Sequence, residues 1–85
     1  MEKKIDFSED RIIDLISWEL HVQSSNIFPS SSLSNDLNLD TQDKMLLIAA
    51  LENRLDVYLT AEEAEIVETI QDLSQYFYLH ASWKI

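Results

Sequence analysis

The chain contains no glycine, and this absence limits its fold more than any other feature of its 85 residues. Small sheet-rich domains ordinarily need glycine in tight hairpin turns, where the backbone takes positive φ angles. The sequence is instead rich in Leu, Ile, Glu and Asp, has a single proline, and places Ser, Asn and Asp between its apolar runs. This composition predicts an all-α domain whose helices are joined by polar loops.

The length and charge of the chain limit how many domains it can form and which classes of partner it can bind. We expect residues 1–85 to form a single domain, with a lead-in over 1–7 and a tail over 80–85. The absence of cysteine excludes disulfides and thiolate metal sites. A net charge of −10 disfavours nucleic acids and anionic membranes, and it favours basic surfaces on partner proteins. No long apolar run is present, so we expect no membrane span and a cytoplasmic protein.

Capping residues and apolar periodicity divide the chain into four helices. The predicted helix starts follow four capping residues: Ser8, Asp40, Thr60 and Thr69. The first three helices are expected to end near Val22 to Ser24, at about Leu55 and near Val67. At the start of the second helix, the Asp43 side chain can accept a return hydrogen bond from the Asp40 N–H, as in a capping box. The pattern predicts a small antiparallel four-helix bundle of three main helices and one short one, with a long first loop.

The second predicted helix has an inner and an outer side. Five apolar residues at helical spacing are expected to face the core: Met45, Leu47, Ile48, Leu51 and Leu55. Leu46 and Ala49 fall on the outer side. Leu46 either forms a small contact patch with Met45 and Ala49 or is a singly exposed leucine, which is common on protein surfaces.

Patterns typical of catalysis and of metal binding are missing. A glycine-rich phosphate loop is impossible without glycine, and the two histidines, His21 and His80, lie on different predicted helices. The segment from Asp36 to Asp40 imitates the first ligands of an EF-hand loop. Thr41 and Leu47 occupy the positions where that loop needs glycine and glutamate. We therefore expect neither an enzyme nor a dedicated metal site.

Residues 32–43, with the sequence Ser-Leu-Ser-Asn-Asp-Leu-Asn-Leu-Asp-Thr-Gln-Asp, resemble the acyl carrier protein family. In that family a long loop ends in Asp-Leu-Gly-x-Asp-Ser-Leu. Residues 50–52, 59–65 and 69–72 resemble further family motifs in the same order, so the match covers about residues 8–79. The resemblance implies a helical carrier without enzymatic activity. It also implies a 4′-phosphopantetheine arm on the serine, and an acidic second helix that binds basic patches on synthases and transferases.

The sequence departs from the family pattern where the arm is attached. Thr41 stands in the place of the serine, directly after Asp40, and its β-methyl group crowds the hydroxyl. Thr41 and Asp40 are therefore the candidate cofactor-binding residues. The resemblance also points to a set of partner-binding residues on the second helix: Gln42, Asp43, Met45, Leu46, Ala49 and Asn53.

Two functions remain open on these grounds. In the first, the protein has lost the arm, holds no cofactor, and acts as an adaptor or regulator that binds proteins through its second helix. In the second, it is a working carrier in fatty-acid, polyketide or peptide synthesis, with 4′-phosphopantetheine attached at Thr41. A structural subunit that uses Leu46, Trp18 and Trp83 as contacts is a third possibility. The sequence leaves the cargo, the partner and the oligomeric state open.

Overall fold

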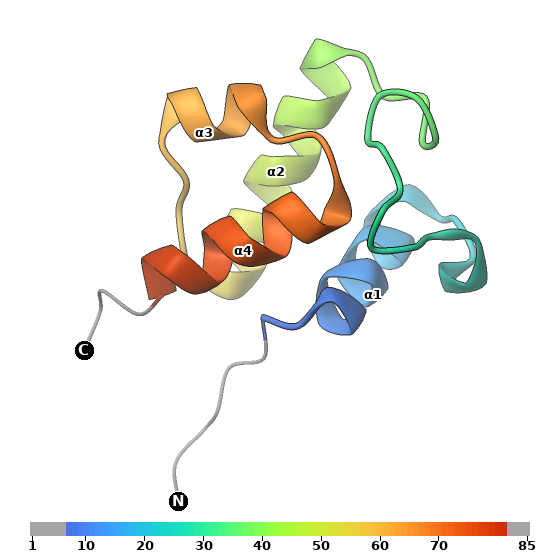
Figure 1. The fold of residues 1–85 in the computed structure, drawn as a ribbon, viewed down its shortest axis with the longest axis horizontal. Helices are drawn as coiled ribbons and strands as arrows, with labels where there is room; N and C mark the ends of the chain where they lie inside the picture. Colours follow the sequence, from blue (N-terminus) through green and yellow to red (C-terminus); the bar gives the residue numbers. More distant parts are fainter. Residues whose placement is uncertain (1–6, 82–85) are drawn as a thin grey trace, which may run out of the picture.

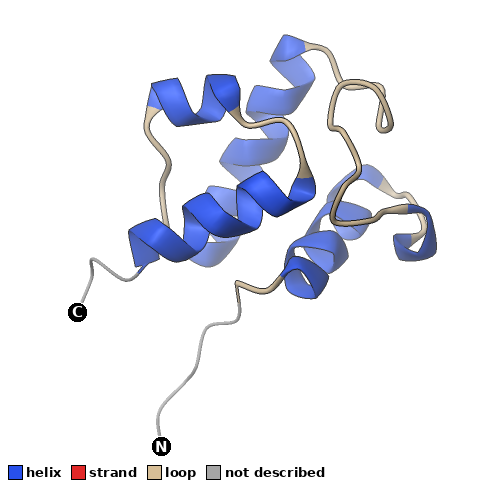
Figure 2. Ribbon diagram, in the orientation of Figure 1, coloured by secondary structure: helices blue, strands red, loops and turns tan. Residues whose placement is uncertain are grey.

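Four α-helices pack around one apolar core in the computed structural model, which describes residues 7–81 (Figure 1). They are α1 (Glu9–Leu20), α2 (Thr41–Leu55), α3 (Ala61–Ile66) and α4 (Ile70–Ala81). Within the described residues Figure 2 shows no strand, and the one isolated bridge joins Ser32 to Thr69. The prediction of an all-α bundle with three main helices and one short helix is confirmed.

Side-chain caps begin the helices at the predicted residues. Each of four side chains accepts a hydrogen bond from the backbone N–H three residues further on: Ser8, Asp40, Thr60 and Thr69. At α3 the capping box is complete, because Glu63 accepts a return bond of 2.9 Å from the Thr60 N–H. Asp72 likewise accepts from the Thr69 N–H at 3.2 Å. At α2 only the Asp40 half of the predicted box is seen among the described residues.

The core is built from the inner sides of the helices and from the long loop. Its largest fully buried side chains are Ile12, Ile16, Leu33, Ile48, Leu51, Val67, Ile70, Leu73 and Phe77. Leu33 lies in the loop between α1 and α2, so that loop is anchored in the core rather than draped over it. Burial of apolar surface, at roughly 25 cal/mol per Å², is the main force that holds this chain, which has no cysteine and therefore no disulfides.

Two helix boundaries differ from the expectations, and one short turn was not expected. α1 ends at Leu20, before the predicted end near Val22 to Ser24, because His21 takes the left-handed conformation with φ 58° and closes the helix. The following residues form a short 3-10 turn, η1 (Ser24–Asn26), that the loop composition did not indicate. α4 continues through Ala81, so it includes the first two residues of the expected tail. Residues 82–85, with Trp83, and residues 1–6 of the lead-in lie outside the described part.

Met45 does not face the core as its spacing predicted, since it is 36% exposed. The buried side of α2 consists of Leu47, Ile48, Leu51 and Leu55. With 100° per residue, Met45 lies roughly 100° from the middle of that buried arc. The other four members of the predicted inner side are buried as expected.

The long loop is tied to the junction between α3 and α4, as the path of the chain in Figure 1 shows. The Leu33 N–H donates to the Glu68 carbonyl at 2.7 Å, and the Gln71 N–H donates to the Pro29 carbonyl at 2.9 Å. These bonds place the start of α2 beside that junction. None of the helices within residues 7–81 combines the length and the apolar character that crossing a membrane requires.

Candidate functional site

The junction between Asp40 and Thr41 is exposed at the start of α2. Asn38 turns the loop into the helix with a φ of 57°, a left-handed conformation that asparagine adopts more readily than most residues. The Asp40 carboxylate then accepts from the Asp43 N–H at 2.7 Å. Thr41 is the first helical residue, where backbone N–H groups lack helical partners and the helix dipole is positive. The Thr41 hydroxyl therefore belongs to an exposed residue at the N-terminus of a helix.

A polar cavity of about 340 Å³ lies on one side of this junction. Its lining residues are Ser34, Leu39, Asp40, Thr41, Lys44 and Glu68. The Glu68 carboxylate accepts hydrogen bonds from the hydroxyls of Ser32 and Ser34. The hydrogen bond from Ser32 has the largest effect and that from Ser34 the next largest, and both lower the pKa of Glu68 below the ordinary value of a glutamate. Glu68 is therefore negatively charged at neutral pH. Sequence reasoning did not single it out, because its partners lie more than thirty residues away.

Lys44 fastens α2 to the end of α3. Its ammonium group donates to the carbonyl of Glu65 at 2.8 Å and to the carbonyl of Val67 at 2.9 Å. These carbonyls lie at the C-terminal end of α3, where a cation is favoured by the helix dipole. The positive charge of Lys44 is therefore directed toward the end of α3.

All six candidate partner-binding residues are exposed on α2: Gln42, Asp43, Met45, Leu46, Ala49 and Asn53. Five of them, all except Asp43, lie within an arc of roughly 100° at 100° per residue. We call these five uncharged residues the outer face. Leu46 is its most apolar projection, with 62% of its surface exposed.

A second cavity, of about 350 Å³, lies where α2 meets the end of α1. We call it the α1–α2 groove, and it is lined by Glu19, Leu20, Leu39, Asp43, Leu46 and Leu47. Two of these residues belong to the candidate set, while Glu19, Leu20 and Leu39 were not predicted to lie there. The same side of α2 carries Arg54, whose Nε donates to the Glu19 carboxylate at 2.8 Å. The Arg54 guanidinium also lies 5.9 Å from the centre of the exposed Trp18 ring.

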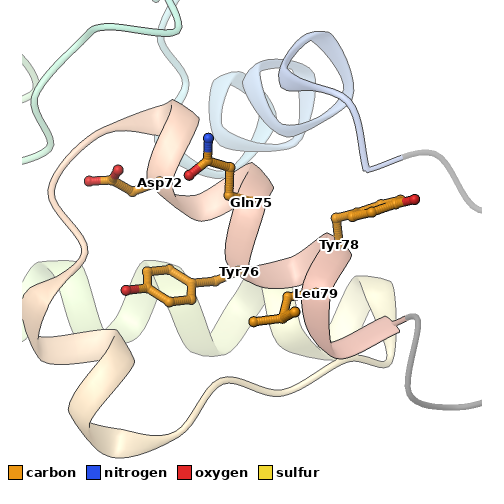
Figure 3. A pocket seen from close by; sticks show the side chains of 5 residues that line it. All are labelled: Asp72, Gln75, Tyr76, Tyr78 and Leu79. Atoms are coloured by element: carbon orange, nitrogen blue, oxygen red, sulfur yellow. The ribbon is translucent and has the colours of Figure 1, made fainter.

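A third cavity, of about 440 Å³, is formed by α4 (Figure 3). Its lining residues are Asp72, Gln75, Tyr76, Tyr78 and Leu79. In Figure 3 the rings of Tyr76 and Tyr78 point to different sides of the helix. None of the candidate residues belongs to this cavity, so its size alone does not make it the functional site.

α4 is joined to α3 by a side-chain contact near its C-terminal end. His80 Nε2 lies 2.6 Å from the Glu63 carboxylate. The pKa of Glu63 is lowered mainly by the hydrogen bond from the Thr60 N–H, and His80 lowers it further. Both residues have structural partners here. Among the described residues no group of three His, Cys, Asp or Glu side chains is arranged to hold a metal ion.

Comparison with known proteins identifies the family. No protein-family model matches the chain. The acyl carrier protein of Chlorobium phaeovibrioides is 37% identical over 68 residues, which cover 80% of this chain and 87% of that protein. The acyl carrier protein of Syntrophobacter fumaroxidans is 35% identical over 66 residues, which cover 78% and 82%. That of Cyanidioschyzon merolae is 32% identical over 71 residues, which cover 84% and 78%. The chain belongs to the acyl carrier protein family.

Proposed function

We propose that this protein is a non-enzymatic, protein-binding member of the family, which works without a phosphopantetheine arm as an adaptor or regulator. The observation that carries this proposal is the outer face of α2. Five exposed and uncharged side chains lie together on a protein with a net charge of −10, directly beside the exposed Thr41. An uncharged surface of this kind on an acidic protein is suited to contact with another protein.

The charges of α2 support the same proposal, because most of them have partners within the protein. Lys44 binds the carbonyls at the end of α3, and Arg54 pairs with Glu19. The Glu52 carboxylate accepts from the Leu59 N–H at 2.9 Å. α2 therefore offers a partner mainly apolar and amide groups, with Asp43 at the edge. A basic partner surface would find few carboxylates on the outer face itself.

The surroundings of Thr41 give limited support for an arm. A phosphodiester at this position would gain from the positive end of the helix dipole. The cavity beside Thr41, however, is lined by the carboxylates of Asp40 and Glu68, and the one cation in its lining, Lys44, is already bound to α3. The β-methyl group of Thr41 adds steric hindrance at the hydroxyl. When bound, such an arm supplies a thiol that holds an acyl chain as a thioester.

Intact mass spectrometry tests the absence of the arm. The protein and its Thr41→Ser and Thr41→Ala variants are each co-expressed with a broad-specificity phosphopantetheinyl transferase. We expect the protein to keep its unmodified mass. A gain of one arm that Thr41→Ala abolishes would overturn the proposal. Loading of Thr41→Ser alone would assign the block to the extra methyl group. If neither the unchanged protein nor Thr41→Ser gains the arm, the block lies in the rest of the site.

The second candidate function is a working carrier with the arm on Thr41, serving a synthase or transferase. One observation favours it: Thr41 is exposed, so its hydroxyl is within reach of an enzyme. In this case the protein gains the arm and Thr41→Ser gains it faster, since a primary hydroxyl is less hindered. The time course of the mass change separates this function from the first.

A further inference from the structure

The α1–α2 groove has the features of a seat for part of a partner protein. Three leucines contribute apolar surface beside the core: Leu20 and Leu39 are partly buried against it, and Leu47 is buried. The exposed Leu46 forms one wall. The volume of about 350 Å³ corresponds to on the order of ten liquid waters. Replacing such waters with one large apolar side chain is favourable, because leucine surfaces offer water few hydrogen bonds.

The charges at the edge of the α1–α2 groove indicate which charged group of the partner should lie beside that apolar side chain. Two carboxylates line the groove, Glu19 and Asp43. Glu19 is already paired with Arg54. Within residues 7–81, Arg54 lies beside Glu19 and His80 beside Glu63, and no cationic side chain is paired with Asp43. A partner that fills the groove would therefore gain from a cation placed opposite Asp43.

We propose that the α1–α2 groove seats one large apolar side chain of a partner protein, with a lysine or arginine of that partner paired to Asp43. This inference rests on the proposed function, since it extends partner binding from the outer face of α2 to the end of α1. A second copy of this chain is a poor occupant. Each copy carries a net charge of −10 and would bring further carboxylates to a rim that already holds two.

A synthetic amphipathic peptide with leucine and lysine at helical spacing serves as the probe. It is titrated into the isotope-labelled full-length protein, and methyl and amide NMR shifts are followed. We expect saturable shifts at Leu20, Leu39, Leu46 and Leu47. A peptide with glutamate in place of every lysine should cause none, because it would face Asp43 with like charge.

Matched variants separate the groove from general attraction to an acidic protein. Leu46→Glu should weaken binding of the lysine peptide by roughly tenfold, since it places a charge in the apolar seat. Asp43→Asn should weaken it by roughly threefold to tenfold. Leu79→Glu and Glu62→Gln repeat the same chemical changes at exposed positions on α4 and α3, and we expect affinities within about twofold of the original. Equal losses in the two sets would overturn the proposal.

The pattern of shifts separates failure of this inference from failure of the proposed function. Shifts confined to Gln42, Ala49 and Asn53 would support binding through the outer face and reject the groove. Shifts spread over the acidic surface, or none at millimolar peptide, would reject the groove as well. Self-association that Leu46→Glu removes, measured by analytical ultracentrifugation, would make a second copy the occupant and overturn the proposal.

Discussion

The two sides of the start of α2 differ in how their polar groups are used. On the side of the long loop, Glu68 binds two serine hydroxyls, and Lys44 binds the end of α3. On the side of α1, the groove has leucine walls, and Asp43 lacks a cationic partner within the described residues. The first side is held by hydrogen bonds that fix the surroundings of Thr41. The second side leaves apolar surface and one charge available to another molecule. The first side fixes the position of the start of α2, and the second is the side that we propose binds a partner.

The largest effect on stability should follow from removing the Lys44 hydrogen bonds on the side of the long loop. Lys44→Met deletes two hydrogen bonds from a charged group to carbonyls of the α3 end, and we expect a loss of about 1–3 kcal/mol in the free energy of unfolding. Urea unfolding followed by circular dichroism measures it. Leu46→Ser, on the side of the α1–α2 groove, is the contrasting variant. Its free energy of unfolding should change by less than about 0.5 kcal/mol. Equal stabilities of the two variants would contradict the division between the sides.

A smaller loss should follow from removing the cap between the two sides. Asp40→Ala deletes the acceptor of the 2.7 Å bond from the Asp43 N–H, at a cost of about 1 kcal/mol. Asp40→Asn keeps an acceptor at the same place and should retain most of the stability. The same urea titration measures both. A pair of variants that lose stability equally would show that the charge, rather than the hydrogen bond, is what matters at this position.

The smallest effect is expected from Glu68, and it depends on pH. Hydrogen bonds from Ser32 and Ser34 lower the pKa of Glu68 in the folded protein. The stability that Glu68 contributes is therefore present above the ordinary pKa of a glutamate, and it is lost as the pH falls through the lowered value. Glu68→Gln should melt below the unchanged protein near neutral pH, and the gap should narrow in acid.

The control for Glu68 must remove one negative charge without touching this network. Glu62→Gln does so at an exposed position of α3. Both variants lose one negative charge and gain similarly from reduced charge repulsion, so the difference between their melting temperatures reports the interactions of Glu68. A difference that stays constant from neutral to strongly acidic pH would show that the serine hydroxyls do not depend on the charge of Glu68.

The sequence was a good guide to what depends on nearby residues. Helix starts were predicted because a cap such as Thr60 and its partner Glu63 lie three residues apart. The positive φ of Asn38 follows from a residue type that tolerates it. Leu46 and Ala49 were placed on the outer side by helical periodicity alone. The candidate position Thr41 was likewise identified from a local motif.

Contacts between distant residues were beyond such reasoning. Glu19 pairs with Arg54, which lies on another helix more than thirty residues away. Lys44 binds α3 carbonyls that lie more than twenty residues further along the chain, beyond the reach of local patterns. Met45 was assigned to the core because helical spacing does not say where the buried arc ends. The α1–α2 groove exists only because α1 and α2 are packed together.

Leu39 lies at the boundary of the two cavities, since it lines both the groove and the polar cavity beside Thr41. A side chain seated in the groove would rest against the same residue that borders Thr41. A partner that displaces Leu39 from the groove side would also change the surroundings of Thr41, and the two events would then be thermodynamically linked. Such linkage is reciprocal: any factor by which a seated partner alters the equilibrium at Thr41 is the factor by which a change at Thr41 alters the affinity for the partner.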